Sequence, residues 1–372
     1  MSSNSTILTV PLRAGLLGAG VIAAGHASAL RLIPGVELIA VCDRDLQKAT
    51  QLQTQFGIPQ VFDDVGQMLR TANLDVVHIL LPPSVHAEAA IECLRANCHV
   101  FVEKPFTLST AEGKRTQAVA EHQGKTIGVN HNLTYLPGML RLIEEVKRYR
   151  VGAVEHVTVV YNLPMPALAA GQHGHWMLGD TNRLILELAP HPVSVICRLV
   201  GEVQEAATVV SGGMVLKNGK QFYDTWQSSL VCTRGTGQLF LSVGRDYLNT
   251  WVHLVGEDGE IFVDLRRNTV RLSEKTKYLR MDNLIDSWRN GKETVRASLG
   301  TFVRQTQGAL GLKPPFDMQS ESMNMSILAY YEALLNDWPV PVGAAEGLTV
   351  VRGCEAIIES ALGARTALTG RK

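Results

Sequence analysis

Three small residues near the start of the chain have the spacing of a turn that lets a ligand approach the backbone. In LLGAGVIAAGH, Gly18, Gly20 and Ala23 fit the pattern G-x-G-x-x-G/A, with Val21 and Ile22 between them. The first glycine permits a sharp turn, the second leaves room for a pyrophosphate, and the third small residue lets a helix pack closely on a strand. The amides at the start of that helix favour phosphate charge. A packing seam of small residues without a ligand is the alternative.

An acidic residue follows the turn at a suitable distance. VELIAVCD ends in Asp43, twenty residues beyond Ala23, where a carboxylate can accept hydrogen bonds from an adenosine ribose. The glycine turn, the twenty-residue spacing and the acidic residue together predict that the chain binds a dinucleotide cofactor. This cofactor would contact Gly18, Gly20, Val21, Ile22 and Asp43. Because Asp43 would repel a 2′-phosphate, NAD is favoured. Arg44 could pair with that phosphate, which keeps NADP open.

The elements that position this turn alternate regularly through the first 130 residues. Short apolar runs rich in Val, Ile and Leu alternate with amphipathic stretches, which is typical of a parallel sheet covered on both faces. Ser109 and Glu112 form a capping box at the start of one helix. The predicted strands are 13–17, 37–42, 76–81, 99–102 and 126–129, and the predicted helices lie near 20–32, 45–56, 84–96 and 109–122.

After residue 130 strand-like runs follow one another, which favours a mainly antiparallel sheet in an α+β domain. We expect helices near 139–149 and 317–336 to cover one face of this sheet, while a helix near 346–363 could instead reach back to the first domain. A length of 372 residues suits two domains, which we place at 1–130 and 131–372. The predicted strands are 154–161, 205–210, 225–233, 237–243, 250–255 and 260–264.

Several further stretches resemble one protein family across essentially the whole chain. They are LLPPSVHAEAA, VFVEKP, LELAPHPVSVICRLVG and GLTVVRGCEAIIESA, together with GAGVIA. The chain is thereby similar to the Gfo/Idh/MocA family, which contains glucose–fructose oxidoreductase, inositol dehydrogenase and relatives. The resemblance implies a Rossmann domain and a C-terminal α/β domain with an open, mainly antiparallel sheet. It also implies NAD(P)-linked oxidation or reduction of a secondary alcohol on a sugar, sugar nucleotide or polyol.

The resemblance assigns roles to individual residues. The lysine of EKP maps onto Lys104, which in the family lies beside the nicotinamide and the reacting hydroxyl. The catalytic histidine maps onto His191, and the acid four residues before it maps onto Glu187, where aspartate is commoner. Two positions depart from the family pattern. Ser194 stands where the family often has aspartate, and Thr134 stands where many members have arginine.

The residue types themselves suit this chemistry. Oxidation of a secondary alcohol needs a hydride acceptor, a base for the hydroxyl proton and groups that orient the carbon. Lys104 and His191 are candidate bases. Pro192 suits the first position of a helix, which would leave His191 near the cap, where the positive helix end keeps the imidazole neutral. Glu187 could orient that ring or bind a substrate hydroxyl, and an ordinary salt bridge is its alternative.

The loops after the third and fourth strands supply further cofactor contacts, for which the candidates are Leu81, Pro82, His86 and Glu103 besides Lys104. A structural role for His86 is nearly as consistent with the sequence. Asn132 is a candidate substrate contact.

A histidine-rich segment, GQHGHWMLGD, precedes the His191 region. His175 and Trp176, with His173, could stack on a sugar face, and a packed structural loop is the alternative. Metal binding is not expected, because no two further ligands lie nearby at metal spacing.

Bulk properties exclude several other classes of function. The chain has 35 basic and 35 acidic residues, so its charge gives no reason to expect nucleic acid or a membrane surface as partner. The N-terminus has no secretory pattern and no apolar run is long enough to span a bilayer, so we expect a cytoplasmic protein. Six scattered cysteines without a CxxC pair are typical of reduced core thiols.

Two features bear on assembly. QSSLVCT and GQLFLSVG place Leu, Val and Phe on alternating positions, which predicts an apolar open sheet face and therefore a homodimer or homotetramer through that sheet. The segment 266–304 has ten Lys/Arg against four Asp/Glu. It could be a solvated face, an oligomer arm or a contact for a diphosphate.

Two other functions stay open on the sequence alone. The same fold serves NAD-dependent glycoside hydrolases, in which transient oxidation permits elimination. A non-catalytic dinucleotide-binding protein is the second, because Ser194 and Thr134 depart from the family pattern.

Overall fold

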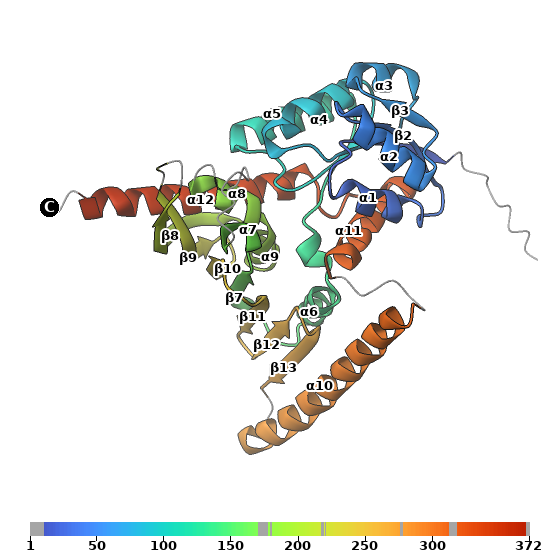
Figure 1. Cartoon of the computed structure of the whole chain (residues 1–372). Helices are drawn as coiled ribbons and strands as arrows, with labels where there is room; N and C mark the ends of the chain where they lie inside the picture. The colour runs from blue at the N-terminus through green and yellow to red at the C-terminus, as the bar shows by residue number, and fades with distance from the viewer. Residues whose placement is uncertain are drawn as a thin grey trace, which may run out of the picture. The chain divides into compact units, whose positions relative to one another are not determined.

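The computed structural model describes residues 11–169, 178, 181–216, 219, 221–275, 278–311 and 318–369. These residues form two compact units, which are described separately (Figure 1). Unit 1 comprises the chain up to residue 130 together with 323–348, and unit 2 comprises 131–322 together with the chain from 349 onward. The passage from one unit to the next at residue 130 is where the texture of the sequence changes.

Unit 1 is built on a six-stranded parallel sheet, as the alternating pattern predicted. The strand order β3-β2-β1-β4-β5-β6 reverses between β1 and β4, which is the switch point of a dinucleotide-binding fold. The sequence missed β3 and α3, whose short, partly buried segments carry little periodicity. The bounds are β1 Leu12–Leu17, β2 Val36–Cys42, β3 Gln60–Phe62, β4 Val76–Ile79, β5 His99–Val102, β6 Ile127–Val129, α1 Ala23–Leu30, α2 Leu46–Phe56, α3 Val65–Thr71, α4 His86–Arg95 and α5 Thr110–Gln123.

The predicted capping box at the start of α5 is present in part, because the Glu112 carboxylate bonds the amide one residue before the N-cap. Ser109 Oγ accepts a hydrogen bond from the Glu112 amide at 3.3 Å, and the Glu112 carboxylate accepts one from the Leu108 amide at 3.1 Å. The helix ends at Gly124 with a φ of 61°, a left-handed conformation that glycine adopts without steric cost.

The helix α11 (Met318–Leu335) belongs mainly to unit 1, which corrects the expectation that it covers the second sheet. Ile327, Tyr330 and Tyr331 on this helix are fully or almost fully buried in the same core as Leu16 and Phe101. The periodicity of α11 showed that it has a buried face but gave no information on which sheet it contacts. The following helix, α12 (Ala344–Thr369), lies mostly in unit 2.

Unit 2 contains a seven-stranded sheet of order β13-β12-β11-β7-β10-β9-β8. Five of its neighbouring pairs are antiparallel, and β7 pairs with β10 in parallel, so the mainly antiparallel prediction is confirmed. The bounds are β7 Val154–Leu163, β8 Val203–Val215, β9 Gln221–Cys232, β10 Gly235–Val243, β11 Asn249–Gly256, β12 Gly259–Asp264, β13 Thr269–Glu274, α6 Pro137–Lys147, α7 Pro166–Ala169, α8 Thr181–Leu188, α9 Pro190–Val200 and α10 Leu279–Ala309.

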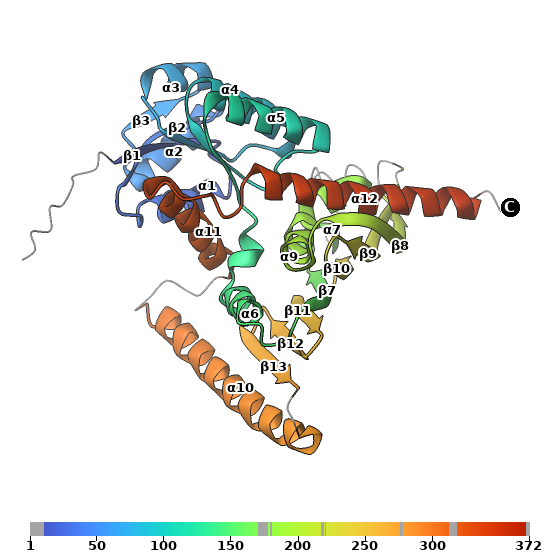
Figure 2. The same ribbon diagram turned by 180° about the vertical axis from the view of Figure 1, so that it is seen from behind.

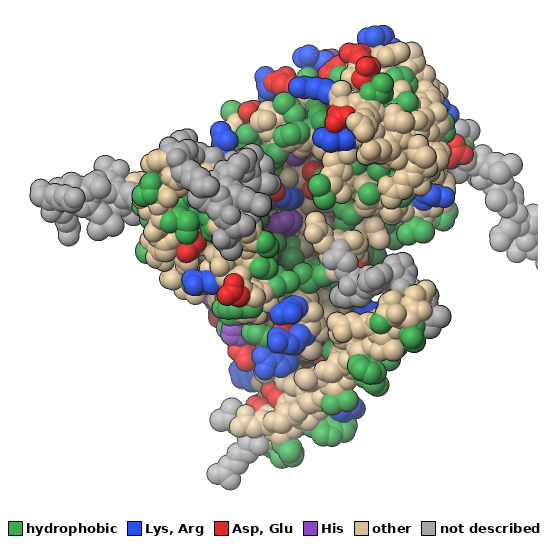
Figure 3. Space-filling model, in the orientation of Figure 1, with side chains coloured by type: hydrophobic (Ala, Val, Ile, Leu, Met, Phe, Trp, Pro, Cys, Tyr) green, Lys and Arg blue, Asp and Glu red, His purple; other side chains and the backbone are tan. Residues whose placement is uncertain are grey.

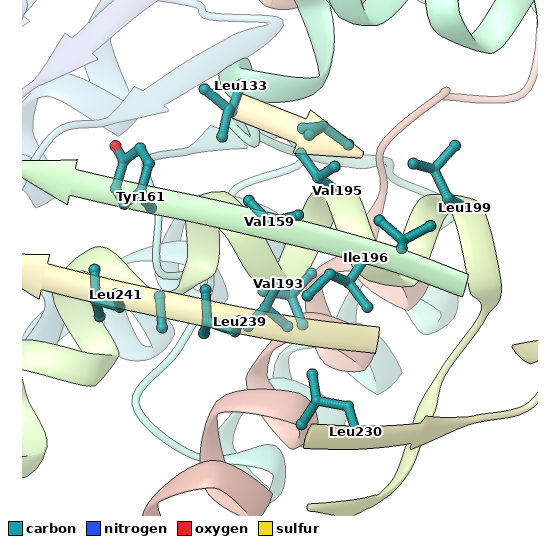
Figure 4. Packing of buried hydrophobic residues seen from close by; sticks show 14 of the residues in the cluster. Leu133, Val159, Tyr161, Val193, Val195, Ile196, Leu199, Leu230, Leu239 and Leu241 are labelled. Carbon is teal, nitrogen blue, oxygen red and sulfur yellow. The ribbon is translucent and has the colours of Figure 1, made fainter. Parts of the chain in front are cut away.

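One face of this sheet is covered by α9. Val193 and Ile196 of the helix pack among Leu239 and Leu241 of β10 and Val159 of β7 (Figure 4). This cluster is the core of unit 2, and it fixes where the residues at the start of α9 lie.

The opposite, open face is mixed in polarity, so the predicted apolar face is wrong. Strand alternation turns the leucines of β9 and β10 to the covered side, and Gln227, Ser229 and Gln238 are exposed on the open side. Val209, Val215 and Val231 are exposed valines on this side, at 67%, 68% and 50%.

The 31-residue helix α10 is the largest element that the sequence analysis did not assign. It lies beside β13 at the end of the sheet, as Figures 1 and 2 show. Within the described part of the chain, none of the helices combines the length and the apolar character needed to span a membrane.

Candidate functional site

The candidate cofactor residues gather at one edge of the parallel sheet of unit 1. Gly18 follows β1, Asp43 follows β2, Leu81 and Pro82 follow β4, and Lys104 follows β5. Because the strands are parallel, their carboxyl ends meet at the same edge, where the switch point between β1 and β4 also lies.

The glycine turn has different steric constraints at its two glycines. Gly18 has a φ of +111°, and a Cβ there would stand 2.6 Å from the Leu80 carbonyl oxygen, so only glycine fits. A Cβ on Gly20 would meet nothing within 4 Å, so the space above this residue is open. Gly20 is exposed, and Val21 next to it is 99% exposed. The turn therefore leaves open the approach that a pyrophosphate needs.

The helix α1 starts directly behind this turn. Ala23 is completely buried, which confirms the predicted close packing of helix on strand. Ile22 at the N-cap offers no hydrogen-bonding side chain, and the first turn contains no acid. Nothing on α1 itself therefore competes with an anion for its N-terminal amides.

Asp43 fixes the glycine turn to the end of β2. Its Oδ2 accepts a hydrogen bond from the Ala19 amide at 2.7 Å, and its Oδ1 accepts one from the Asp45 amide at 2.9 Å. A carboxylate has about four lone-pair positions, so acceptor capacity is left for ribose hydroxyls. Arg44 is exposed beside it. These residues fit the adenosine end of a dinucleotide.

Glu103 of the EKP motif is part of a buried hydrogen-bond network. Its Oε1 lies 2.9 Å from His26 Nε2 and accepts a second bond from Asn130 Nδ2, while its Oε2 accepts one from the Lys104 amide at 3.2 Å. Burial alone would raise the pKa of Glu103, but the bonds from His26 and Asn130 outweigh it and lower the pKa to about 2. Glu103 therefore positions the backbone of Lys104 from inside the unit.

The network continues through a second histidine to α11. His26 Nδ1 lies 2.8 Å from His78 Nδ1, and His78 Nε2 lies 2.9 Å from the Tyr331 hydroxyl. Burial and the neighbouring His26 keep the pKa of His78 well below its ordinary value, so this ring is neutral. The row of hydrogen bonds therefore runs from the Glu103 carboxylate through the His26 and His78 rings to the Tyr331 hydroxyl.

His86 has a structural position. Its Nδ1 lies 2.8 Å from the Pro105 carbonyl oxygen and its Nε2 lies 2.8 Å from the Leu81 carbonyl oxygen. The side chain is 1% exposed, and burial lowers its pKa. The ring thus lies between the carbonyl oxygens of the loop after β4 and the loop after β5, to one of which a neutral ring can donate.

In unit 2, Glu187 and His191 lie four residues apart where α8 leads into α9. The helix α9 begins at Pro190, two residues earlier than the sequence suggested, so His191 lies inside its first turn. The Tyr161 ring at the end of β7 stands 5.8 Å from the His191 ring, centre to centre. Burial and the nearby Glu187 charge raise the pKa of Tyr161, which keeps its hydroxyl protonated. The structure therefore brings together Glu187, His191 and Tyr161.

The two departures from the family pattern have local explanations. Ser194 Oγ donates to the His191 carbonyl oxygen at 2.7 Å, so Ser194 bonds the helix backbone. Thr134 is 2% exposed and donates to the His131 carbonyl oxygen at 2.8 Å, so it is no substrate contact. Asn132 is 9% exposed, and its Nδ2 donates to Ser322 Oγ at 3.1 Å.

Sequence reasoning missed His26, His78, Asn130, Tyr331 and Tyr161. His78 had a detectable signal, because a histidine inside the apolar run VVHI is a polar group that needs buried partners. His173, His175 and Trp176 lie outside the described residues. Among the residues that are described, no group of three or more His, Cys, Asp or Glu side chains could hold a metal ion.

Comparisons with known proteins agree with the motifs. Residues 12–131 match the model of an oxidoreductase family with an NAD-binding Rossmann fold. A D-glucoside 3-dehydrogenase of Escherichia coli is 31% identical over 152 residues, and the matching segment covers 41% of this chain and only 43% of that protein. The chain therefore spans less than half the length of this relative.

Other comparisons extend over more of the chain. The NADP⁺-dependent scyllo-inositol 2-dehydrogenase of Bacillus subtilis is 23% identical over 339 residues and covers 86% of each chain. The fold resembles a levoglucosan dehydrogenase complexed with NADH and levoglucosan, with a TM-score of 0.78, 17% identity and coverage of 95% and 98% of the two chains. The motifs and the strand order of unit 1 agree with these matches: residues 12–131 match the Gfo/Idh/MocA family of NAD-binding oxidoreductases, and the longer alignments extend the similarity over most of the chain.

Proposed function

We propose that this protein is an NAD-dependent dehydrogenase that transfers hydride between a nicotinamide and a secondary hydroxyl or ketone of a sugar, sugar nucleotide or polyol. The observation that carries the proposal is the joint placement of the open turn at Gly20, the Asp43 carboxylate and Lys104 at one edge of the sheet. The relatives named for a glucoside and an inositol support the substrate class.

Unit 1 would hold the cofactor. The amides at Gly20 and at the start of α1 would bind the pyrophosphate, and Asp43 would accept hydrogen bonds from the adenosine ribose. When bound, the nicotinamide would supply the hydride acceptor or donor. The amine of Lys104 would bond the reacting hydroxyl and take up its proton, and Glu103 would keep the Lys104 backbone in place.

Unit 2 would supply the groups that orient the substrate. Glu187 is an acceptor for sugar hydroxyls, and His191 is a second candidate for the proton. Tyr161 stays protonated and can therefore donate a hydrogen bond in this group.

NAD is the preferred cofactor in this proposal. The Asp43 carboxylate is fixed by two backbone amides, so it cannot easily turn away from the charge of a 2′-phosphate. The exposed Arg44 is the group that would attract such a phosphate. Comparison of NAD and NADP dissociation constants by calorimetry tests the preference, which an equal affinity for both would contradict.

The activity is tested by absorbance at the reduced-nicotinamide band with a panel of sugars, polyols and sugar nucleotides. Lys104→Met should lower kcat by about 10²- to 10⁴-fold with little change in NAD affinity, because a proton acceptor is lost and the cofactor site is not. Lys114→Met, at an exposed position on α5, is the matched control. Full turnover by the Lys104 variant would remove the assigned role. Release of free sugar from glycosides without net reduced cofactor would indicate the hydrolase instead.

A homodimer or homotetramer through the open face of the unit 2 sheet remains part of the proposal. Its support is the family resemblance and the exposed Val209 and Val231, since the face as a whole is mixed in polarity. Val231→Glu should lower the mass of the assembly in light scattering if this face is the interface.

A further inference from the structure

The helix α10 is amphipathic, but its polar side is the one that faces its own unit. Asn290 Oδ1 accepts a hydrogen bond from the Leu272 amide of β13 at 3.1 Å. Arg289 pairs with Glu274 on the same strand, and Glu293 pairs with Arg141 on α6. The polar residues of the basic segment noted in the sequence therefore serve to attach the helix.

The apolar side chains of α10 point away from unit 2. Trp288, Val295, Leu299 and Phe302 are each between 62% and 68% exposed. Hydrophobic side chains are visible along the helix in Figure 3. A row of such residues on one helix is more than scattered surface hydrophobics and marks a surface that is covered in use. The exposed apolar residues of this helix are Met281, Leu284, Ile285, Trp288, Val295, Leu299, Phe302 and Val303.

These eight exposed apolar residues form a stripe along α10, and the arrangement of the stripe indicates what kind of surface covers it. At about 100° per residue, all eight side chains fall within an arc of roughly 100°. Met281, Trp288, Val295 and Phe302 recur every seven residues, which is the repeat of a helix that pairs with another helix. A helix that lies in a membrane surface presents a broader apolar face and an excess of basic charge. Over its 31 residues α10 has five basic and three acidic residues, so the basic excess is only two charges.

We propose that α10 pairs with α10 of a second copy of this chain, antiparallel and about a two-fold axis at Val295. In this register Trp288 and Phe302, each seven residues from Val295, lie opposite each other, and Leu299 lies opposite Gly291. Between residues 288 and 302 the stripe is thus complementary to itself: the central valines meet, the aromatic residues stack on both sides, and each leucine enters the gap over a glycine.

The charged residue within the stripe and the surface area that two helices would bury are both consistent with this pairing. Lys292 lies within the arc, and its Nζ stands 4.0 Å from the centre of the Trp288 ring, so its charge is partly compensated on its own helix. Opposite it stands Ser298, a small polar residue. A helix of this length offers a strip about 45 Å long and about 10 Å wide. Two copies would therefore bury on the order of 1,000 Å², which is the lower range for a specific interface.

Light scattering and sedimentation velocity on the full chain test the proposal. Val295→Glu should halve the mass of the assembly, because it places two carboxylates against each other at the axis. Thr294→Glu, an exposed neighbour outside the arc, should leave the mass unchanged. Val295 is 68% exposed, so its replacement removes no core contact, and circular dichroism checks that the fold is retained. The same mass for Val295→Glu and the wild type would overturn the proposal.

Cysteine cross-linking tests the register. Val295→Cys should give a disulfide-linked dimer on mild oxidation, because the two-fold axis brings its two copies together. Trp288→Cys should not link to itself, since its copies would stand about 21 Å apart along an antiparallel pair. Self-linking of Trp288→Cys indicates a parallel pair and rejects the register. Binding of the wild type to phosphatidylcholine–phosphatidylglycerol vesicles that Val295→Glu abolishes, with no change of mass, rejects the second copy in favour of a membrane surface.

Discussion

The buried row of side chains from Glu103 to Tyr331 gives a residue-scale prediction about stability. Tyr331→Phe removes only the hydroxyl that hydrogen-bonds to His78 Nε2, and it leaves that buried nitrogen without this partner. We expect the free energy of unfolding to fall by about 1–3 kcal/mol, the usual cost of leaving a buried polar group unsatisfied. Tyr247→Phe, at a position that is 55% exposed, should change it by less than about 0.5 kcal/mol in the same urea titration. Equal effects of the two variants would show that the hydroxyl contributes nothing.

His78 and Glu103 of this buried row also make the free energy of unfolding depend on pH. The pKa of His78 is lowered in the folded protein by burial, so the unfolded chain binds a proton near pH 6.5 that the folded chain does not. The free energy of unfolding should therefore be highest above pH 6.5 and decrease below it, by up to about 1.4 kcal/mol per pH unit for this group. Glu103, whose pKa is lowered to about 2, adds a second loss as the pH falls from about 4.5 toward 2.

Urea unfolding between pH 7.5 and 5.0 measures the first effect. His78→Gln cannot titrate, so its stability should decrease less steeply over this range than that of the wild type. If the free energy of unfolding of His78→Gln decreased with pH as steeply as that of the wild type, the pH dependence could not be assigned to His78.

At the residue scale, the sequence predicted what a short segment determines. Gly18, Gly20 and Asp43 form a pattern within thirty residues, and the structure gives each the geometry that the pattern requires. The partners of His78 could not be read in this way, because its contacts are 52 residues away at His26 and 253 residues away at Tyr331. Periodicity shows that a group is buried but does not name its partner.

At the scale of the element, the turn between β1 and α1 predicts different outcomes for its two glycines. Gly18→Ala should destabilise unit 1 by about 1–3 kcal/mol, because the φ of +111° and the Leu80 carbonyl oxygen both exclude a Cβ. Gly20→Ala should fold like the wild type, since its Cβ meets nothing, but it should raise the dissociation constant for NAD at least tenfold. Thermal unfolding and NAD titration of both variants check this. Unchanged NAD affinity in Gly20→Ala would place the pyrophosphate elsewhere.

The predicted elements show the same division between local and distant information. Five strands of unit 1 and six of unit 2 were predicted, most of them within two residues, because apolar runs and turn residues define them locally, whereas β8 and β9 extend four to five residues beyond the predicted ranges. The helix at 317–336 was found but assigned to the wrong sheet, and the open face was expected to be apolar because the leucines of β9 and β10 were assigned no side. Both errors concern packing partners, which the periodicity of one element does not contain.

At the scale of the whole molecule, the chain passes between the two units three times, after residues 130, 322 and 348. Every residue proposed to contact the cofactor lies before residue 105, but the core beneath them is completed by Ile327, Tyr330 and Tyr331. Truncation of one large buried side chain costs about 2–5 kcal/mol, and a domain has only about 5–15 kcal/mol in all. Unit 1 therefore depends on a segment that begins at residue 323, which is 194 residues after the end of its sheet at residue 129.

This dependence predicts that a chain ending at residue 322 will not bind NAD, although it contains the glycine turn, Asp43 and Lys104. In the full chain, Ile327→Ala should lower the stability of unit 1 by about 2–5 kcal/mol, because the residue is completely buried. Met325→Ala on the same helix, at a position that is 38% exposed, is the matched control and should have a much smaller effect. NAD titration by calorimetry and near-ultraviolet circular dichroism compare the three proteins with the wild type. If the shortened chain bound NAD with the affinity of the full chain, the first 130 residues would fold without α11, and the core that includes Tyr330 and Tyr331 would be dispensable for the cofactor site.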